Sequence, residues 1–281
     1  MSNKKIGLVL EGGTFRGIFS AGVMDAFLMR GIEFPYITGV SAGISNAVSY
    51  VSKQPGRNLE LLERFRNDKR YLGFENFIKN GAYFGLDFVY NEIPNIHVPF
   101  DYNTFRQYKG EIKVGVTNAE TGKEEFLNAL KDTEKWEYLR ASCAIPGYFP
   151  AIKIDGKSFY DGGLASPVTY AKALKDGCEK LVIILTRPKG FVRKLSKSTA
   201  AMSQIIKFRY PKLEMLLLAR HKIYNAQMAR ISELEKSGKA IVIRPLYTLE
   251  SFEKDVTRIR ENYRHGFDVA ESYLPQIEEL F

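Results

Sequence analysis

Residues 39–43, Gly-Val-Ser-Ala-Gly, place one serine hydroxyl between small residues. A short apolar run ends at this pentapeptide, and a helix-like segment from residue 44 to 53 follows it. A serine on a sharp turn from strand to helix is exposed for nucleophilic attack, and the flanking Gly39 and Gly43 let neighbouring backbone approach closely. A tight connection without chemistry can carry the same pentapeptide. Ser41 is therefore a candidate nucleophile that needs a base and an oxyanion-binding group.

A serine nucleophile usually relies on a histidine as its base. The chain has only His97, His221 and His265, and none of them follows a predicted strand as a triad histidine would. We therefore expect none of the three to be catalytic, and a carboxylate becomes the candidate base.

Asp161 ends a short predicted strand and is followed by Gly162 and Gly163. An aspartate at a strand end beside flexible backbone can be presented to the end of a neighbouring strand. An aspartate before glycine is also typical of an ordinary turn, and the local sequence alone favours that interpretation.

Residues 12–17, Gly-Gly-Thr-Phe-Arg-Gly, form a glycine-rich turn between an apolar run and a predicted helix. Backbone N–H groups in such a turn can bind an anion. A dinucleotide site would need G-x-G-x-x-G and an acidic residue about 20 positions later, whereas this turn has Thr14 at its third position and Glu33 falls in a loop. An oxyanion hole beside a serine needs only the N–H groups, and we favour that interpretation.

These three motifs, in this order, resemble those of the patatin-like phospholipase family. Residues 141–150, Ala-Ser-Cys-Ala-Ile-Pro-Gly-Tyr-Phe-Pro, are similar to the A-S-x-A-x-P-x-x-F-P segment that precedes the family's aspartate, and the resemblance spans residues 5–190. It implies a Ser41–Asp161 dyad without histidine, and hydrolysis of lipid or phospholipid carboxylic esters through an acyl-enzyme. It implies no metal and no cofactor. The implied oxyanion hole consists of the N–H groups of Gly12, Gly13 and Thr14.

One position departs from the family pattern, because Thr14 stands where the family usually has a third glycine. Its β-branched side chain restricts the backbone and narrows the pocket. Arg16 matches a basic position of the family and could bridge carboxylates structurally or face a lipid phosphate; we favour the structural role. The residues that support the motifs are Arg16, Gly17, Gly39, Gly43, Gly162 and Gly163.

The order of predicted elements indicates an α/β fold. Continuous apolar runs at 5–10 and 180–186 are typical of buried parallel strands. We expect helices over 18–30 and 166–176, a hairpin of 111–118 with 124–127, and a last strand near 240–244. The resemblance implies a three-layer α/β/α fold with a mainly parallel sheet and a helical C-terminal segment. We divide the chain into a catalytic domain, 1–190, and a helix-rich segment, 191–281.

Two apolar regions have open interpretations. The stretch 74–105 is rich in aromatic residues and could shape an acyl-chain pocket, form a mobile cover or belong to the ordinary core. Near the C-terminus, apolar residues recur at helical spacing from Phe252 to Leu274, which most simply indicates a core-facing helix.

Positive charge is concentrated in one sector. Residues 187–222 contain ten Lys and Arg against the single acid Glu214, which accounts for the whole net charge of +9. Such a sector could contact an anionic membrane or be a solvated helical face. We expect peripheral membrane contact through residues 187–222 and no nucleic-acid binding, because no nucleic-acid motif accompanies the charge. A catalytically idle fold that binds membranes is the alternative function, and an acyltransferase would need a serine–histidine pair.

The two cysteines, Cys143 and Cys178, indicate neither a disulfide framework nor a metal site, and we expect both to pack inertly. No uninterrupted apolar stretch of about 18 residues occurs. We therefore expect a soluble, cytoplasmic protein that could also lie at a membrane surface.

Overall fold

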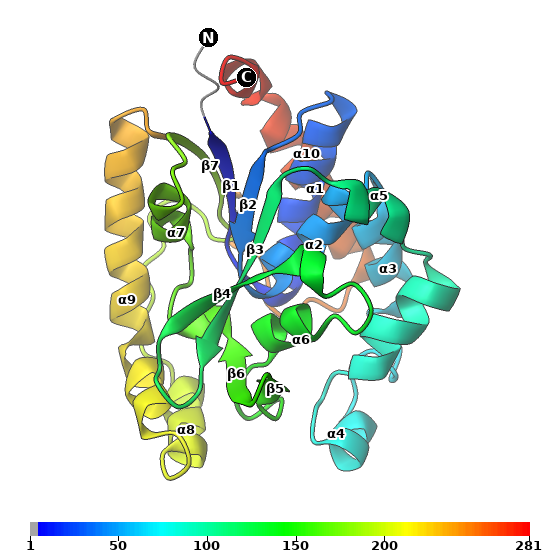
Figure 1. Cartoon of the computed structure of the whole chain (residues 1–281), viewed down its shortest axis with the longest axis vertical. Coiled ribbons are helices and arrows are strands. Elements are labelled where there is room, and N and C mark those ends of the chain that lie inside the picture. The colour runs from blue at the N-terminus through cyan, green and yellow to red at the C-terminus, as the bar shows by residue number, and fades with distance from the viewer. Residues whose placement is uncertain (1–4) are drawn as a thin grey trace.

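An eight-stranded sheet forms the middle layer of the molecule, which we describe over residues 5–281 of a computed structural model (Figure 1). Its order is β5-β6-β3-β2-β1-β7-β8, and β4 pairs with β3 outside this path. Strands β3, β2, β1, β7 and β8 run parallel, whereas β4 and β6 are antiparallel to β3. The predicted mainly parallel sheet is confirmed. The strands are β1 (Ile6–Leu10), β2 (Tyr36–Gly39), β3 (Glu111–Asn118), β4 (Glu124–Asn128), β5 (Ile152–Ile154), β6 (Lys157–Asp161), β7 (Lys180–Ile184) and β8 (Ala240–Ile243).

Helices cover both faces of the sheet, as the predicted three-layer fold requires (Figure 1). One face carries α1 (Gly17–Met29) and α2 (Ser41–Val51), and the other carries α7 (Tyr170–Lys175) and α9 (Pro211–Lys236). The remaining helices are α3 (Arg57–Phe65), α4 (Phe74–Asn80), a π-helix η2 (Phe88–His97), α5 (Tyr102–Gln107), α6 (Glu137–Cys143), α8 (Lys197–Ile206), α10 (Val256–Glu271) and α11 (Leu274–Glu278). Short 3₁₀ turns are η1 (Thr14–Arg16), η3 (Ala129–Lys131) and η4 (Gly162–Leu164).

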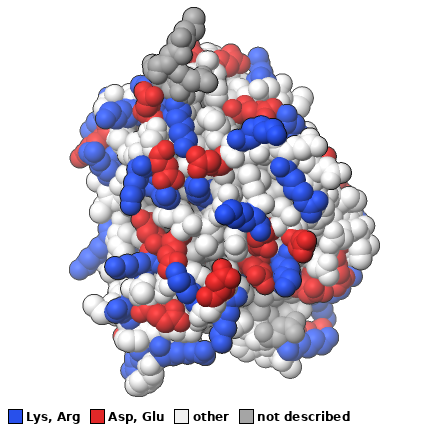
Figure 2. All heavy atoms as spheres, viewed as in Figure 1, with Lys and Arg blue, Asp and Glu red and all other residues white. Residues whose placement is uncertain are grey.

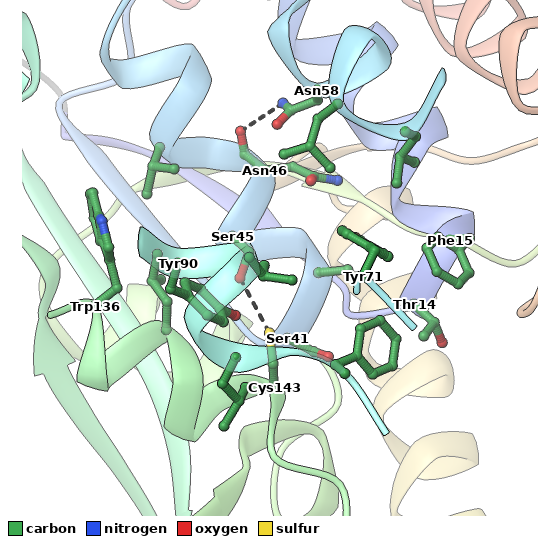
Figure 3. Close-up of a pocket in the computed structure, with 18 of the residues that line it drawn as sticks. Thr14, Phe15, Ser41, Ser45, Asn46, Asn58, Tyr71, Tyr90, Trp136 and Cys143 are labelled. Carbon is green, nitrogen blue, oxygen red and sulfur yellow. Dashed lines mark hydrogen bonds between the residues drawn. The ribbon is translucent and has the colours of Figure 1, made fainter. Parts of the chain in front are cut away.

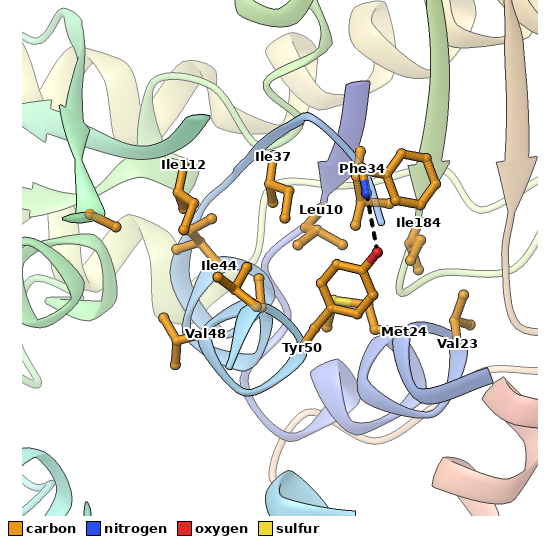
Figure 4. Packing of buried hydrophobic residues seen from close by; sticks show 14 of the residues in the cluster. Leu10, Val23, Met24, Phe34, Ile37, Ile44, Val48, Tyr50, Ile112 and Ile184 are labelled. Atoms are coloured by element: carbon orange, nitrogen blue, oxygen red, sulfur yellow. Dashed lines mark hydrogen bonds between the residues drawn. The ribbon is translucent and has the colours of Figure 1, made fainter. Parts of the chain in front are cut away.

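Successive residues of the central strand pack into opposite layers. Leu8 and Leu10 of β1 belong to the cluster with α1 and α2, which Figure 4 shows from close by, whereas Val9 packs with α7 and α9. All three side chains are fully buried. This alternation follows from the strand period of two, and a strand buried on both faces reads as a continuous apolar run.

The carboxyl ends of β1, β2 and β7 meet at one edge of the sheet. Because these strands are parallel and in register, Leu10 lies between Gly39 and Ile184. The glycine turn after β1, the start of α2 after β2 and the loop after β7 therefore converge. This edge is the usual position of ligand sites in parallel α/β sheets.

The C-terminal residues join both the sheet and a helical layer. Strand β8 pairs with β7, and α10 crosses α1 so closely that a Cβ on Gly22 would overlap the Tyr263 carbonyl oxygen. A Cβ on Gly266 would likewise overlap the Phe19 carbonyl oxygen. The hydroxyl of Tyr263 donates to Asp25 Oδ2 at 2.7 Å. The apolar stripe faces the core as predicted at Ile259 and Ala270 of α10, whereas Phe252 lies before this helix and is 46% exposed. The domain boundary at residue 190 stays a prediction.

One predicted helix begins later than expected. The Ser-Pro pair at 166–167 predicts a start there, but α7 begins at Tyr170. Gln227 of α9 holds the intervening segment, because its Oε1 accepts from Val168 N–H at 3.0 Å and its Nε2 donates to Ser166 Oγ at 3.2 Å. These tertiary contacts outweigh the local capping signal. Over residues 5–281, no helix is both long enough and apolar enough to span a bilayer.

Candidate active site

Ser41 occupies the strained turn between β2 and α2. Its φ is +54°, the left-handed region that non-glycine residues rarely adopt. The turn can form because glycine flanks it: a Cβ on Gly39 would lie 2.8 Å from Leu10 Cβ, and one on Gly43 would lie 2.5 Å from the Glu11 carbonyl oxygen. A strained serine at the end of a central strand is the geometry of a nucleophile elbow.

The elbow is held from the far side by Ser142, a residue that sequence reasoning missed. Ser142 is fully buried; its Oγ accepts a hydrogen bond from Ser41 N–H at 2.8 Å and donates to the Gly115 carbonyl oxygen at 2.7 Å. It therefore ties α6 and β3 to the nucleophile turn. The only sequence signal for it is its place in the 141–150 segment.

Strand β6 brings Asp161 to the same edge, because it runs antiparallel to β3 and its last residue pairs with Val116. The Asp161 side chain accepts a hydrogen bond from Gly163 N–H at 2.7 Å. Burial, at 4% exposure, is the main influence on this carboxyl and raises its pKa. The positive charge of Arg220 and the neighbouring Ser41 hydroxyl act in the opposite direction and lower the pKa. Ser41 follows β2 and Asp161 ends β6, with β3 between these two strands in the sheet, and both residues line the same cavity.

The glycine turn lies against the elbow. A Cβ on Gly12 would lie 2.8 Å from Ser41 Cβ, and one on Gly13 would lie 2.8 Å from Thr186 Oγ1, so side chains are excluded at both positions. Thr14 adopts φ +52°, a strained value for a β-branched residue. Across residues 5–281, the N–H groups of these three residues donate no hydrogen bond. They form a row of unpaired donors beside Ser41.

The supporting motif residues make close backbone contacts. Gly17 lies under α2, because a Cβ there would be 3.0 Å from both Ala42 Cβ and Asn46 Nδ2. A Cβ on Gly162 would overlap the Gly115 carbonyl oxygen. Arg16 bridges no carboxylate in the part of the chain described, contrary to the favoured structural role, and its Nη1 donates to Ser251 Oγ instead.

An apolar cavity of about 180 Å³ opens on one side of Ser41 (Figure 3). Its walls come from α2, α3, α6 and the aromatic stretch 74–105. Figure 3 shows Tyr71, Tyr90 and Trp136 around it. Of the aromatic stretch, Phe84, Tyr90 and Phe100 line the cavity, whereas Phe77 and Tyr83 stack on each other with ring centroids 4.6 Å apart. Some residues of this stretch therefore line the cavity, and others pack against each other away from it.

A polar cavity of about 270 Å³ opens on the other side. The two cavities share Thr14, Ser41 and Ile145. Arginine side chains line the polar cavity together with the two candidate motifs, and they come from the glycine turn, the loop after β7 and α9: Arg16, Arg187, Arg193 and Arg220. Three of these belong to the basic sector of the sequence, for which the charge pattern predicts a surface position.

The histidines lie elsewhere, since neither cavity is lined by one. His97 packs against Phe65 and Phe88, and His265 stacks on Tyr247 with centroids 4.5 Å apart. Within residues 5–281, no group of three or more His, Cys, Asp or Glu side chains could hold a metal ion.

Cys143 adjoins the candidate nucleophile. Its thiol lies 3.2 Å from Ser45 Oγ (Figure 3), and burial raises its pKa to about 11. The thiol is therefore protonated near neutral pH and is not a competing nucleophile. Cys178 is buried among apolar residues behind β1 and β7.

Two family models match the chain. The patatin-like phospholipase model matches residues 8–174, and a model for a domain of unknown function matches residues 210–281. The chain is 29% identical over 191 residues to the uncharacterised protein YjjU of Escherichia coli strain K12, which covers 66% of this chain and 52% of that protein.

Fungal lysophospholipases also match. One of Aspergillus niger is 26% identical over 178 residues, covering 60% of this chain and 11% of the fungal protein. One of Candida glabrata is 23% identical over 304 residues, covering 99% of this chain and 16% of the fungal protein. The chain thus spans about half the length of the bacterial relative and a small part of the fungal ones. Among solved structures, VipD from Legionella pneumophila aligns over 98% of this chain and 67% of its own, at 14% identity and a TM-score of 0.48.

Proposed function

Because this chain belongs to the patatin-like phospholipase family, we propose that it hydrolyses carboxylic esters of lipids, with Ser41 as nucleophile and Asp161 as its base. The observation that carries the proposal is the surroundings of the Ser41 hydroxyl. It lies beside a buried carboxylate and a row of unpaired N–H groups, where an apolar and a polar cavity meet. That arrangement suits an amphiphilic ester whose carbonyl lies at the junction.

In the first chemical step, Asp161 accepts the hydroxyl proton while Ser41 Oγ forms a bond to the ester carbonyl carbon. The carbonyl oxygen becomes an oxyanion and accepts hydrogen bonds from the N–H groups of Gly12, Gly13 and Thr14. The bond to the alcohol oxygen then breaks, and the proton on Asp161 passes to that oxygen. The products are a free alcohol and an acyl group on Ser41.

In the second step, water replaces the alcohol. Asp161 takes a proton from the water as its oxygen attacks the acyl carbon, and the same N–H groups bind the new oxyanion. Ser41 Oγ leaves and recovers its proton from Asp161, which releases the fatty acid. An aspartate with an ordinary pKa of about 3.9 is a weak base, and burial strengthens this one by raising its pKa.

A fluorophosphonate probe tests the proposal directly. We expect covalent labelling and aryl-ester hydrolysis by the natural chain, and loss of both in Ser41→Ala. Ser272→Ala, at an exposed position after α10, is the matched control and should behave like the natural chain. An unlabelled natural chain would leave an idle fold as the better description. Labelling retained in Ser41→Ala would exclude Ser41 as the nucleophile.

We also propose that the protein works in the cytoplasm, where a surface formed by α8 and the start of α9 contacts anionic membrane. Ile205 is 71% exposed and Phe208 is 90% exposed, with Lys207 and Arg209 beside them. Figure 2 shows Lys and Arg next to uncharged surface at the lower end of this face, where α8 lies in Figure 1. A Cβ on Gly147 would lie 4.0 Å from Ile205 Cδ1, so this surface adjoins the loop that carries Tyr148 into the polar cavity. Apolar and basic groups together favour binding to anionic lipid.

A further inference from the structure

The polar cavity beside Ser41 is lined by more positive than negative charge. Four arginines line it, against two carboxylates, Glu11 and Asp161. Over residues 5–281, none of the four arginines forms an ion pair with a carboxylate within 4.0 Å. The cavity therefore concentrates positive charge that the protein itself does not neutralise.

Three of these arginines also have a buried donor without a protein partner. The Nε atoms of Arg16, Arg187 and Arg193 are buried and find no hydrogen-bond acceptor within the described part of the chain. Arg16 is only 5% exposed, so bulk solvent does not reach its unpaired Nε donor. An unpaired buried donor on a charged group is costly, and proteins normally satisfy it.

Two of the arginines, Arg187 and Arg193, are also held in place by contacts that leave their guanidinium N–H donors free. The Arg187 guanidinium lies over the Phe191 ring at 4.5 Å, and the Arg193 guanidinium lies over the Tyr224 ring at 4.6 Å. Asn225 of α9 fixes the Arg193 backbone from both sides, because it accepts from Arg193 N–H at 2.9 Å and donates to the Arg193 carbonyl oxygen at 3.0 Å. Stacked, anchored guanidinium groups are preorganised to bind an anion.

Burial and mutual repulsion both disfavour the charged form of these side chains. Burial, followed by the charge of Arg187, lowers the pKa of Arg16 to about 10. Burial, followed by the charge of Arg193, lowers the pKa of Arg220 to about 10. An anion placed among them would offset the repulsion between the guanidinium groups.

We propose that this cavity is a binding site for a phosphate group, with Arg193 and Arg187 as its principal ligands. Guanidinium groups approaching from several elements match an anion with several oxygens, and arginine binds phosphate through paired N–H donors. A phosphate monoester carries about −1.5 to −2 charges at neutral pH, which matches the excess of two positive charges. A phosphate that also carried an attached cation would meet repulsion from the same arginines.

The position of the site relates it to the ester chemistry, and this part of the inference rests on the proposed function. The polar and apolar cavities meet at Ser41, so a lipid with its chain in one and its phosphate in the other has its ester at the nucleophile. Free phosphate offers the same chemistry to the arginines without a chain. The Arg220 contribution comes from the segment that matches a domain of unknown function, which gives that segment a part in the site.

Calorimetry with inorganic phosphate tests the site without turnover. The full chain carrying Ser41→Ala is titrated, alone and with Arg193→Gln or Lys189→Gln added. Lys189 is exposed, lies in the same loop and does not line the cavity, so it is a charge-matched control. We expect Arg193→Gln to weaken binding about tenfold or more, as loss of a charge-assisted hydrogen bond does, and Lys189→Gln to leave it unchanged. Arg187→Gln serves as a second variant if Arg193→Gln proves unfolded by circular dichroism.

Turnover distinguishes a lipid phosphate from free phosphate. With Ser41 intact, kcat/KM is measured on a lysolipid with a phosphate monoester head group and on the monoacylglycerol of the same chain, in neutral detergent micelles. We expect the natural chain to prefer the phosphorylated lipid and Arg193→Gln to reduce that preference about tenfold. The same lysolipid with a phosphocholine head group should be a poorer substrate.

The outcomes separate the two proposals. Weaker calorimetric binding with unchanged lipid preference assigns the site to free phosphate, and a reduced preference assigns it to the lipid. Equal phosphate affinity and equal lipid preference in the natural chain, Arg193→Gln and Lys189→Gln overturn the site. Absence of any hydrolysis would contradict the proposed function, while the calorimetric result would still decide whether the arginines bind phosphate.

Discussion

The backbone N–H of Ser41 donates a 2.8 Å hydrogen bond to the side chain of Ser142, a residue 101 positions later in the chain. Because that side chain also donates to the Gly115 carbonyl oxygen, Ser142 fixes the turn that presents Ser41. Replacement of Ser142 by alanine would leave the Ser41 N–H and the Gly115 carbonyl without this partner. We expect the free energy of unfolding to fall by about 1–3 kcal/mol, with a lower kcat for aryl esters.

Ser203→Ala is the control for this change. Ser203 is equally buried, but its hydroxyl donates to the Ala200 carbonyl oxygen within α8 at 2.8 Å. Its loss should affect stability and leave kcat unchanged. An equal effect of both variants on kcat would contradict a specific role for Ser142. Denaturant unfolding and steady-state kinetics supply the two measurements.

The ionisation of Asp161 predicts how kcat/KM depends on pH in the acidic range. Burial raises its pKa above the ordinary 3.8. A protonated carboxyl cannot accept the Ser41 proton, so kcat/KM should be lost at low pH and should rise as pH increases through the raised pKa. Hydrolysis of an uncharged aryl ester from about pH 4 to 9 measures this limb. A flat profile down to the ordinary aspartate pKa would be inconsistent with a buried Asp161 acting as base.

Arg220 adjusts that pKa and holds the adjacent loop. Its positive charge lowers the Asp161 pKa, and its Nε donates to the Gly163 carbonyl oxygen at 2.9 Å. Arg220→Gln should therefore move the acid limb of kcat/KM to higher pH. Lys222→Gln removes an exposed charge from the same helix and should leave the limb in place. Identical limbs in the two variants would show that Arg220 does not influence the base.

Thr14 offers a test of strain in the glycine turn. Its φ of +52° costs about 1–2 kcal/mol for a residue with a side chain, whereas glycine brings extra freedom to the unfolded chain worth about 0.5–1 kcal/mol. Thr14→Gly should therefore change the free energy of unfolding by no more than about 1.5 kcal/mol. The side chain lines both cavities, so its removal should lower KM for bulky acyl esters.

Lys53→Gly provides the comparison for Thr14→Gly. Lys53 has nearly the same φ, +55°, but is exposed at the end of α2 and lines neither cavity. Thermal unfolding should respond similarly in both variants, and KM should change only in Thr14→Gly. Unchanged KM for every acyl ester in Thr14→Gly would exclude a role of the threonine in shaping the site.

The exposed ring of Phe208 predicts the strength of membrane contact. Burying a phenylalanine side chain in lipid contributes about 1.5–3 kcal/mol, so Phe208→Ser should weaken partition into anionic vesicles about tenfold or more. Met29→Ser is the control, because Met29 is 69% exposed at the end of α1 remote from Ser41. Co-sedimentation with vesicles measures partition, and hydrolysis of a soluble aryl ester should stay constant. Equal partition of the two variants would place the contact elsewhere.

Features that depend on the pattern of apolar residues within a segment, or on the order of the strands, could be predicted from the sequence. The apolar runs around Leu8 and Ile183 are buried on both faces of the sheet, which is why they could be recognised as parallel strands. Ser41 and Asp161 each lie at a strand end, so their convergence at one edge follows from the topology once β6 pairs with β3. Their catalytic roles stay predictions until they are tested.

Features that depend on tertiary contacts, such as which side chains point into the protein, could not be predicted from the sequence. A count of charges over residues 187–222 does not say which side chains turn inward, and Arg187, Arg193 and Arg220 line a cavity because the loop after β7 is tied to α9. Ser142 is similar, since nothing local distinguishes it from a serine that bonds within its own helix. The delayed start of α7 likewise depends on Gln227, a residue of another helix.

The close contact of α1 and α10 at Gly22 and Gly266 bears on whether the first two thirds of the chain can be separated from the rest. Two glycines allow α1 and α10 to touch main chain to main chain, with no side chain between them to be trimmed or repacked. Excision of residues 1–190 as a separate module would expose the side of α1 that α10 covers, and α1 directly follows the glycine turn at residues 12–17. Transfer of this module to another protein would therefore require α10 as well, or a designed partner helix whose backbone approaches α1 as closely.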